Sequence, residues 1–101
     1  MAQSTSSGKL APKNHPLLNL CSVGPATLRD LLLLGVDTPA KLAASDPRLL
    51  YDELCRRTGQ SVDICQYDVF CCAVAQARDP NLPEECRDWA WWARRRKAAE
   101  A

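Results

Sequence analysis

Cysteine is the residue type with the most chemistry open to it in this sequence, because six cysteines occur in 101 residues. Thiolates bind zinc and iron–sulfur clusters, and they act as redox centres. No Cys-x-x-Cys pair is present, so the spacing of zinc ribbons and thioredoxin-like motifs is missing. Cys65 and Cys72, seven residues apart on an expected helix, have Cα atoms about 10 Å apart, which is too far for a disulfide.

We therefore expect the cysteines to be thiols, most of them buried as small apolar side chains, and we expect no cofactor. A less favoured alternative is a cluster of Cys55, Cys65 and Cys72 that holds zinc or an iron–sulfur centre. A redox-active thiol, which would need a cation such as Arg56 or Arg57 beside it, is the third alternative.

The side-chain pairs that perform acid–base or nucleophilic catalysis are missing. The single histidine, His15, lies near the N-terminus, so the body of the chain offers no Cys–His or Ser–His pair. Acidic residues adjoin one another at Asp52–Glu53 and Glu84–Glu85, and adjacent side chains diverge by about 100° on a helix. We expect a protein that binds a partner and is not an enzyme.

The segment from Leu20 to Thr27, with the sequence LCSVGPAT, offers a ligand backbone groups rather than side chains. Gly24 can form a tight turn, and Pro25 suits the first position of a helix. The N–H groups at the start of such a helix, together with its dipole, attract a phosphate oxygen. The candidate phosphate contacts are Ser22, Val23, Gly24, Ala26, Thr27 and, as the nearest cation, Arg29.

A second group of candidate residues combines tryptophan with a run of four basic residues. Trp89 and Trp92 are three residues apart, so they share one helix face and are expected to close the core. Trp91 falls on another face, where it could stack on a base or anchor a protein partner. The auxiliary candidates are Trp91, Arg94, Arg95, Arg96 and Lys97. The alternative is a solvated basic tail behind a core-capping aromatic pair.

Composition restricts the class of protein. Apolar residues make up 47% of the chain, which is ordinary for one globular domain. Between Pro16 and Ala93 the chain holds seven basic and eleven acidic residues, a net charge of −4, which is not the profile of a strong general DNA binder. No run of about 18 apolar residues and no signal-peptide pattern occurs, so we expect a cytoplasmic protein without a membrane partner.

Capping and proline signals predict the elements that must position these residues. Helices are expected over Pro25–Leu34, after Thr38-Pro39 and after Asp46-Pro47. Two more are expected over Val62–Ala77, capped by Ser61, and over Pro83–Lys97. No strand pattern of any length appears, so the fold class is all-α: one small domain of about five short helices. Residues 1–15 are expected to be a disordered arm, 16–97 the domain and 98–101 a disordered tail.

Several stretches match a known family in order and spacing. They are Val23–Pro25, Asp30–Val36, Asp46–Pro47, Leu50–Cys55, Asp63–Cys65, Val69–Val74 and Trp89–Trp92. In these stretches the sequence resembles the bacterial "pathogenicity locus" helix-hairpin-helix family, some members of which are labelled mitomycin resistance protein. The resemblance covers residues 17–92 and implies a tandem helix-hairpin-helix (SAM-like) core. Two positions depart from the usual hairpin, since Ser22 replaces the first glycine and Ala26 stands where lysine is common.

The sequence thus predicts a non-enzymatic helix-hairpin-helix module. Its favoured partner is double-stranded DNA, contacted through backbone phosphates without base specificity. A protein-interaction adaptor on the same fold is the alternative, because a fold does not determine a function.

Overall fold

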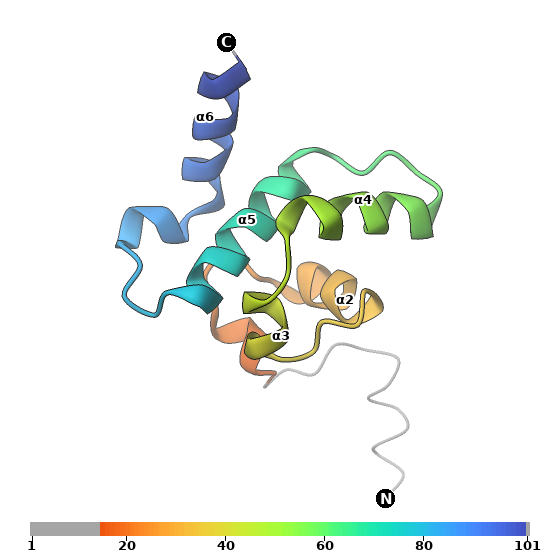
Figure 1. Cartoon of the computed structure of the whole chain (residues 1–101), viewed down its shortest axis with the longest axis horizontal. Coiled ribbons are helices and arrows are strands. Elements are labelled where there is room, and N and C mark those ends of the chain that lie inside the picture. The colour runs from red at the N-terminus through yellow and green to blue at the C-terminus, as the bar shows by residue number, and fades with distance from the viewer. Residues whose placement is uncertain (1–14, 101) are drawn as a thin grey trace, which may run out of the picture.

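The computed structural model describes residues 15–100 of the chain. These residues form five α-helices and two 3-10 helices joined by turns and loops, and no strand occurs among them (Figure 1). In chain order they are η1 (Pro16–Asn19), α2 (Pro25–Leu33), α3 (Pro39–Ala43), α4 (Pro47–Thr58), α5 (Cys65–Arg78), η2 (Glu84–Arg87) and α6 (Trp89–Glu100). The predicted all-α class and the single small domain are confirmed. None of these helices is long and apolar enough to cross a membrane.

Proline and a polar cap begin several helices where the sequence predicted them. The Thr38 Oγ1 atom accepts a hydrogen bond of 3.1 Å from the Lys41 N–H at the start of α3. The Asp46 carboxylate accepts one of 2.8 Å from the Arg48 N–H at the start of α4. Each cap satisfies an N–H that has no partner inside its helix. At the other end of α4, Gly59 takes the left-handed conformation (φ 68°) that glycine adopts readily.

Helix α5 lies at the centre of the fold and packs against α3, α4, α6 and η2 (Figure 1). Its inward side chains Phe70, Ala73 and Val74 are buried. They belong to a core that also contains Leu17, Val23, Leu28, Leu31, Val36, Leu42, Leu50 and Leu54. Removing these side chains from water provides the main driving force for assembly of the short helices.

The start of α5 differs from the prediction, which placed a cap at Ser61 and the first turn at Val62. The helix begins at Cys65, and the Asp63 carboxylate accepts a hydrogen bond of 2.9 Å from the Cys65 N–H. The Tyr51 hydroxyl donates to the carbonyl of Val62. That carbonyl is therefore occupied by a side chain of α4, and the preceding residues form a loop between the two helices.

The predicted helix over Pro83–Lys97 is wrong as a single element, because it breaks at Asp88. Asp88 is extended (φ −106°, ψ 121°) and separates η2 from α6. Its carboxylate accepts a hydrogen bond of 3.0 Å from the Ala90 N–H, as an N-terminal cap does. Helix α6 then continues to Glu100, so residues 98–100, predicted to belong to a disordered tail, are helical.

The predicted N-terminal arm lies outside the described residues except at His15. The His15 Nδ1 atom accepts a hydrogen bond of 3.1 Å from the Leu17 N–H, which makes this residue the cap of η1.

Candidate nucleic-acid interface

The turn between η1 and α2, called the hairpin below, is the segment in which the sequence placed its phosphate contacts. The Val23 N–H donates to the Leu20 carbonyl over 3.3 Å, which closes the turn. Val23 is 6% exposed and lies in the hydrophobic core, so its side chain is not available to a ligand. Ser22 takes a positive φ of 69°, the one described residue other than glycine to do so.

The N-terminus of α2 offers backbone donors. Gly24 is the N-cap residue and no side chain caps the helix there. The first intrahelical bond runs from the Leu28 N–H to the Gly24 carbonyl over 2.9 Å. Pro25 has no N–H, so Ala26 and Thr27 carry the first two donors that the helix itself does not use. Space above the turn is open, because a Cβ added at Gly24 would meet no atom within 4 Å.

Ser22, a predicted phosphate contact, uses its hydroxyl inside the protein. The hydroxyl donates to the Arg87 carbonyl over 3.2 Å and accepts from the Trp89 N–H over 3.1 Å. The neighbouring backbone is held as well, since the Cys21 N–H donates to the Gln76 Oε1 atom over 2.9 Å. The Gln76 amide donates in return to the Cys21 carbonyl over 2.8 Å. The hairpin turn is thus fixed to α5 and to the start of α6.

Arg29 is the cation of the hairpin, and its side chain is exposed one turn into α2. The adjacent acid Asp30 is partly buried, and this burial raises its pKa while the charge of Arg29 lowers it. Since burial is the larger cause, the pKa of Asp30 lies above its ordinary value.

The four basic residues of the run on α6 differ in whether their side chains contact another side chain. Arg96 binds Asp68 of α5 through two hydrogen bonds of 3.0 Å, and the Asp68 side chain is 1% exposed. The guanidinium of Arg95 lies 4.9 Å from the centre of the Trp91 ring. Arg94 and Lys97 are exposed. Arg96 therefore neutralises the charge of the buried Asp68.

The three tryptophans are all half-buried. Trp91 and Trp92 meet edge to face, with ring centres 5.0 Å apart. The Trp92 indole N–H donates to the Cys86 carbonyl over 2.8 Å. Trp92 therefore satisfies a carbonyl at the end of η2 in addition to packing on α5.

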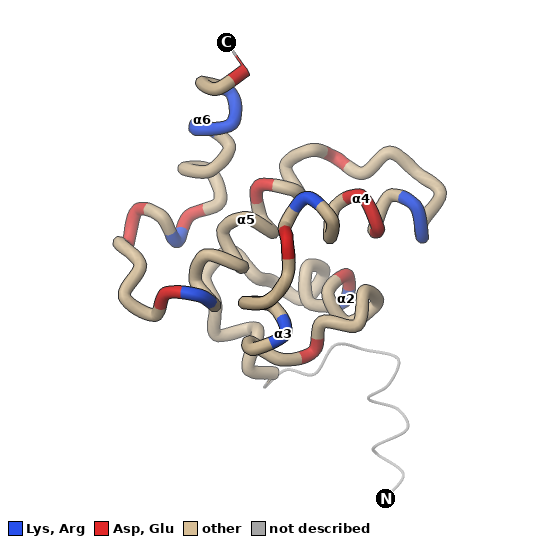
Figure 2. Tube along the Cα trace, viewed as in Figure 1, with Lys and Arg blue, Asp and Glu red and all other residues tan. Residues whose placement is uncertain are grey.

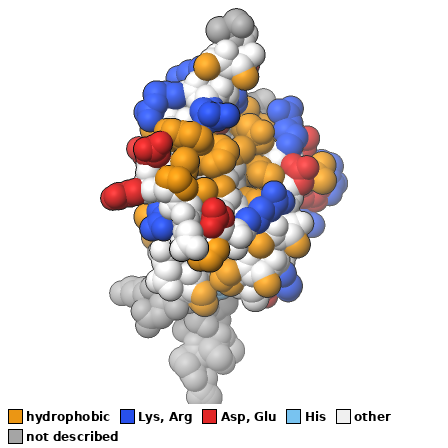
Figure 3. Space-filling view, turned by 60° about the vertical axis from the view of Figure 1, so that its left-hand side comes forward, with side chains coloured by type: hydrophobic (Ala, Val, Ile, Leu, Met, Phe, Trp, Pro, Cys, Tyr) orange, Lys and Arg blue, Asp and Glu red, His pale blue; other side chains and the backbone are white. Residues whose placement is uncertain are grey.

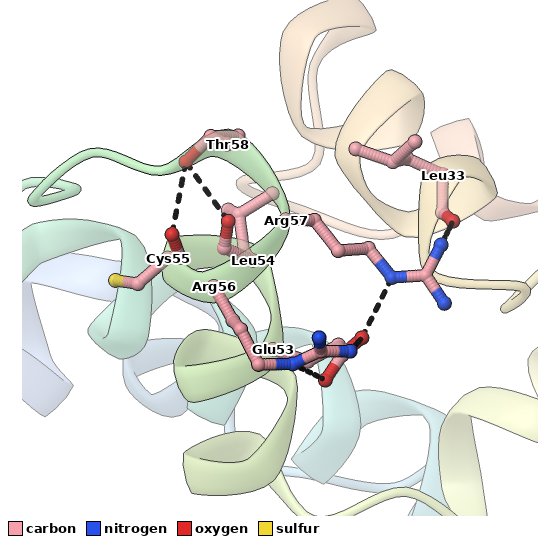
Figure 4. Close-up of polar contacts among 7 residues, drawn as sticks. All are labelled: Leu33, Glu53, Leu54, Cys55, Arg56, Arg57 and Thr58. Atoms are coloured by element: carbon pink, nitrogen blue, oxygen red, sulfur yellow. Dashed lines mark hydrogen bonds and ion pairs between the residues drawn. The ribbon is translucent and has the colours of Figure 1, made fainter.

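The cysteines do not assemble into a metal site. Within residues 15–100 no three Cys, His, Asp or Glu side chains lie close enough to hold an ion, so Cys55, Cys65 and Cys72 form no cluster. Cys72 is fully buried, and this burial raises the pKa of its thiol to about 11. The Cys65 thiol also has a raised pKa, because it hydrogen-bonds to Asp63. The Cys55 sulfur points away from the guanidinium groups of Arg56 and Arg57, one of which the redox alternative places beside it (Figure 4).

Two further cations on α4 are held by a carboxylate. Arg56 and Arg57 both donate to Glu53, and Arg57 also donates to the Leu33 carbonyl over 3.1 Å at the end of α2 (Figure 4). These bonds hold the pKa of Glu53 at about 2. Figure 2 shows a run of basic residues on α6, while the other basic residues and the acidic residues are spread over the fold.

An apolar groove borders α6 on its α5 side. It has a volume of about 400 Å³ and is lined by Tyr67, Asp68, Cys71, Trp92, Arg95, Arg96, Ala99 and Glu100. Hydrophobic side chains also gather between charged ones on the face of the molecule that carries the C-terminal helix (Figure 3). The four charged side chains of the groove balance one another, so its electrostatics favour neither sign of partner.

Sequence reasoning named Ser22 as a phosphate contact but not as a residue that fixes the hairpin, and it missed Gln76. A signal for Ser22 was present, because it replaces a glycine at a turn position where only a special backbone conformation fits. No local signal marked Gln76, which acts on a residue 55 positions away.

A sequence model of the family described as pathogenicity locus (Cdd1) matches residues 12–98. The search of curated proteins found no match, and neither did the search of solved structures.

Proposed function

The chain belongs to the pathogenicity locus family, and we propose that it is a non-enzymatic helix-hairpin-helix module that binds double-stranded DNA through backbone phosphates. The observation that carries this proposal is the uncapped N-terminus of α2. The amide donor of the exposed Ala26, the open space at Gly24 and the exposed Arg29 lie there, whereas Thr27 is only 8% exposed. Backbone N–H groups at a helix start bind phosphate oxygens without reading base sequence.

The available cations set the strength of this binding. Arg29, Arg94, Arg95 and Lys97 are exposed. Arg95 lies over the Trp91 ring and Arg96 is paired with Asp68, so we count Arg29, Arg94 and Lys97 as the phosphate contacts. Three phosphate contacts correspond to a slope of log K against log salt of about −3. We therefore expect weak, sequence-independent binding, in the range of roughly 10⁻⁴ to 10⁻⁶ M near physiological salt.

The experiment measures the fluorescence anisotropy of a labelled 20-base-pair duplex as protein is added, at low and at moderate salt. Gly24→Glu places a carboxylate at the start of α2, where it repels a phosphate and competes for the amides. Gly24→Gln is the matched control, with nearly the same size and no charge. Both substitutions fit the fold, because Gly24 has a φ of −97° and open space around it.

Salt-sensitive binding that Gly24→Glu removes and Gly24→Gln retains supports a phosphate contact at the hairpin. Binding that survives Gly24→Glu places the DNA contact elsewhere. Absence of binding by the unsubstituted protein at low salt refutes the proposal.

A protein-interaction adaptor is the second candidate, and the groove between α5 and α6 favours it. Tyr67 and Trp92 in its lining are the kind of aromatic side chain that anchors protein partners. An adaptor of this kind would be indifferent to DNA, so absence of salt-dependent binding in the same titration supports it over the first proposal.

A further inference from the structure

Most charged side chains in residues 15–100 have a partner inside the protein. Ion pairs engage Asp37, Lys41, Arg48, Asp52, Glu53, Arg56, Arg57, Asp68, Arg96 and Glu100. Hydrogen bonds to backbone groups engage Asp46, Asp63, Arg78, Asp79, Arg87 and Asp88. The charged side chains of this range that make neither contact, called the unpaired charges below, are Arg29, Asp30, Glu84, Glu85, Arg94, Arg95 and Lys97.

The unpaired charges are concentrated in one part of the fold. Apart from the adjacent residues Arg29 and Asp30 on α2, all of them lie on η2 and α6, and all of those are exposed. The acidic ones precede α6 on η2, which packs against α6, and the basic ones lie further along α6 itself. Figure 2 shows this basic run well away from the acidic residues that precede the helix. The two sets of charges therefore do not neutralise each other within one molecule.

The outward face of α6 carries part of this basic run. Trp91, Arg94, Arg95 and Ala98 follow the spacing i, i+3, i+4, i+7, so they form one stripe along the helix. The Arg95 guanidinium lies 4.9 Å from the centre of the Trp91 ring, as expected of residues that share a face. Ala93 is buried and Arg96 binds Asp68 of α5, and both lie about 150° around the helix from the stripe. The stripe thus faces away from α5, at the edge of the fold (Figure 1).

Trp91 divides the unpaired charges of η2 and α6 by sign. Glu84 and Glu85 come before it in the chain, and Arg94 and Arg95 come after it. A second copy of this segment that runs antiparallel to the first places the acidic residues of each copy against the basic residues of the other. A parallel copy places like charges together, which is unfavourable. The order of charges therefore complements itself in one orientation only.

We propose that η2 and the outward face of α6 form the interface of a homodimer, in which two copies of α6 pack antiparallel about a two-fold axis near Trp91. A two-fold interface uses the same surface on both subunits, so that surface must complement itself, as this one does. The half-buried Trp91 supplies the apolar centre, and tryptophan is a residue type that anchors protein interfaces. Arg94 and Arg95 of each copy pair with Glu84 and Glu85 of the other.

The size of α6 limits the strength of this dimer. Its 12 residues span about 18 Å, so the interface belongs to the small end of specific interfaces, and dimer and monomer are in equilibrium. Salt screens the exposed ion pairs and weakens the dimer. Arg94 also belongs to the proposed DNA contact, so DNA and a second copy compete for α6. Dimer formation itself needs no DNA and goes beyond the proposed function.

Sedimentation equilibrium of the full chain tests the dimer without DNA. A reducing agent is present throughout, so that the exposed Cys21 cannot link two chains. The average mass is expected to rise from 11.2 kDa towards twice that value as the protein concentration increases. The dissociation constant is expected to rise with salt. A mass that stays at 11.2 kDa at millimolar protein concentration and low salt overturns the proposal.

Charge reversal tests the orientation of the two copies. Glu84→Lys/Glu85→Lys and Arg94→Glu/Arg95→Glu each place like charges opposite one another, so each weakens the dimer by at least about tenfold. An equimolar mixture of the two variants is expected to associate again, because the introduced lysines of one meet the introduced glutamates of the other. The control is Arg29→Glu, which reverses an unpaired charge on α2 and leaves the dissociation constant unchanged.

Three results of the charge reversals overturn the proposal. They are a dimer that neither double substitution weakens, a mixture of the two variants that remains monomeric, and an equal loss of association in Arg29→Glu. Circular dichroism of each variant checks that its helices are retained. The measurement on the unsubstituted protein depends on none of these variants.

Discussion

Replacement of Arg96 by methionine tests whether the buried ion pair holds α6 on the domain. Asp68 is 1% exposed and the Arg96 side chain 15% exposed, so water screens the pair little. Removing one partner of such a pair leaves an uncompensated buried charge, at a cost of about 3–5 kcal/mol. We take about 3 kcal/mol, because the outer edge of the guanidinium reaches solvent. The third contact of Arg96, to Glu100 over 3.5 Å, adds little at an exposed position.

The expected loss of about 3 kcal/mol is large compared with the total free energy of unfolding of a domain of this size. At about 0.05–0.15 kcal/mol per residue, the described residues support a free energy of unfolding of roughly 4–13 kcal/mol. A loss of about 3 kcal/mol lowers the midpoint of thermal unfolding by roughly 12–24 °C in a domain this small. Circular dichroism at 222 nm measures the midpoint directly.

Arg94→Met is the matched control, since it makes the same change two residues away at an exposed position. Its thermal midpoint should shift by less than about 3 °C. The double substitution Asp68→Leu/Arg96→Met should recover most of the loss, because it leaves no unpaired charge in the apolar site. Equal shifts for Arg96→Met and Arg94→Met, or no recovery in the double variant, would refute this account of the ion pair.

Three further predictions concern stability and reactivity. Hydrogen bonds from two arginines lower the pKa of Glu53 from 4.5 to about 2, so its stabilising effect is complete above pH 4.5 and lost as the pH falls towards 2. Glu53→Gln should therefore unfold at a lower temperature than the unsubstituted protein near neutral pH, and the two midpoints should converge at pH 2. Burial raises the pKa of the Cys72 thiol to about 11, so iodoacetamide at pH 8 should alkylate the exposed Cys21 and spare Cys72, as mass spectrometry of native protein would show; equal labelling would contradict the burial. Gly59→Ala forces a side chain into φ 68° and should cost about 1–2 kcal/mol in urea unfolding, whereas Gly24→Ala, at φ −97°, should change the stability little.

Local signals allowed much of the fold to be predicted. A proline after a threonine or aspartate starts a helix because its own geometry and the cap both favour that start, as at Thr38-Pro39 and Asp46-Pro47. These signals lie within three residues of the helix that they begin. The all-α class follows from several such starts and from the absence of strand patterns.

The errors occurred where a distant side chain competed with a local signal. The hydroxyl of Tyr51 occupies the Val62 carbonyl, so the helix expected from Val62 begins later. The partner of Asp68 could not be inferred from the sequence, because Arg96 reaches it only through the packing of α6 on α5. The role of Ser22 depends on residues 65 and 67 positions away. The turn was therefore predictable, but the use of its hydroxyl was not.

The long-range hydrogen bonds of the hairpin also determine at what stage of protein synthesis the hairpin can reach its final structure. A growing chain is made from its N-terminus, and the partners of residues 21 and 22 are Gln76, Arg87 and Trp89. Until those residues have been added, the left-handed turn at Ser22 has nothing to compensate for its conformation. The hairpin is therefore translated early, but its native hydrogen bonds can form only late. A chain that ends before α6 lacks the Trp89 N–H that Ser22 accepts from.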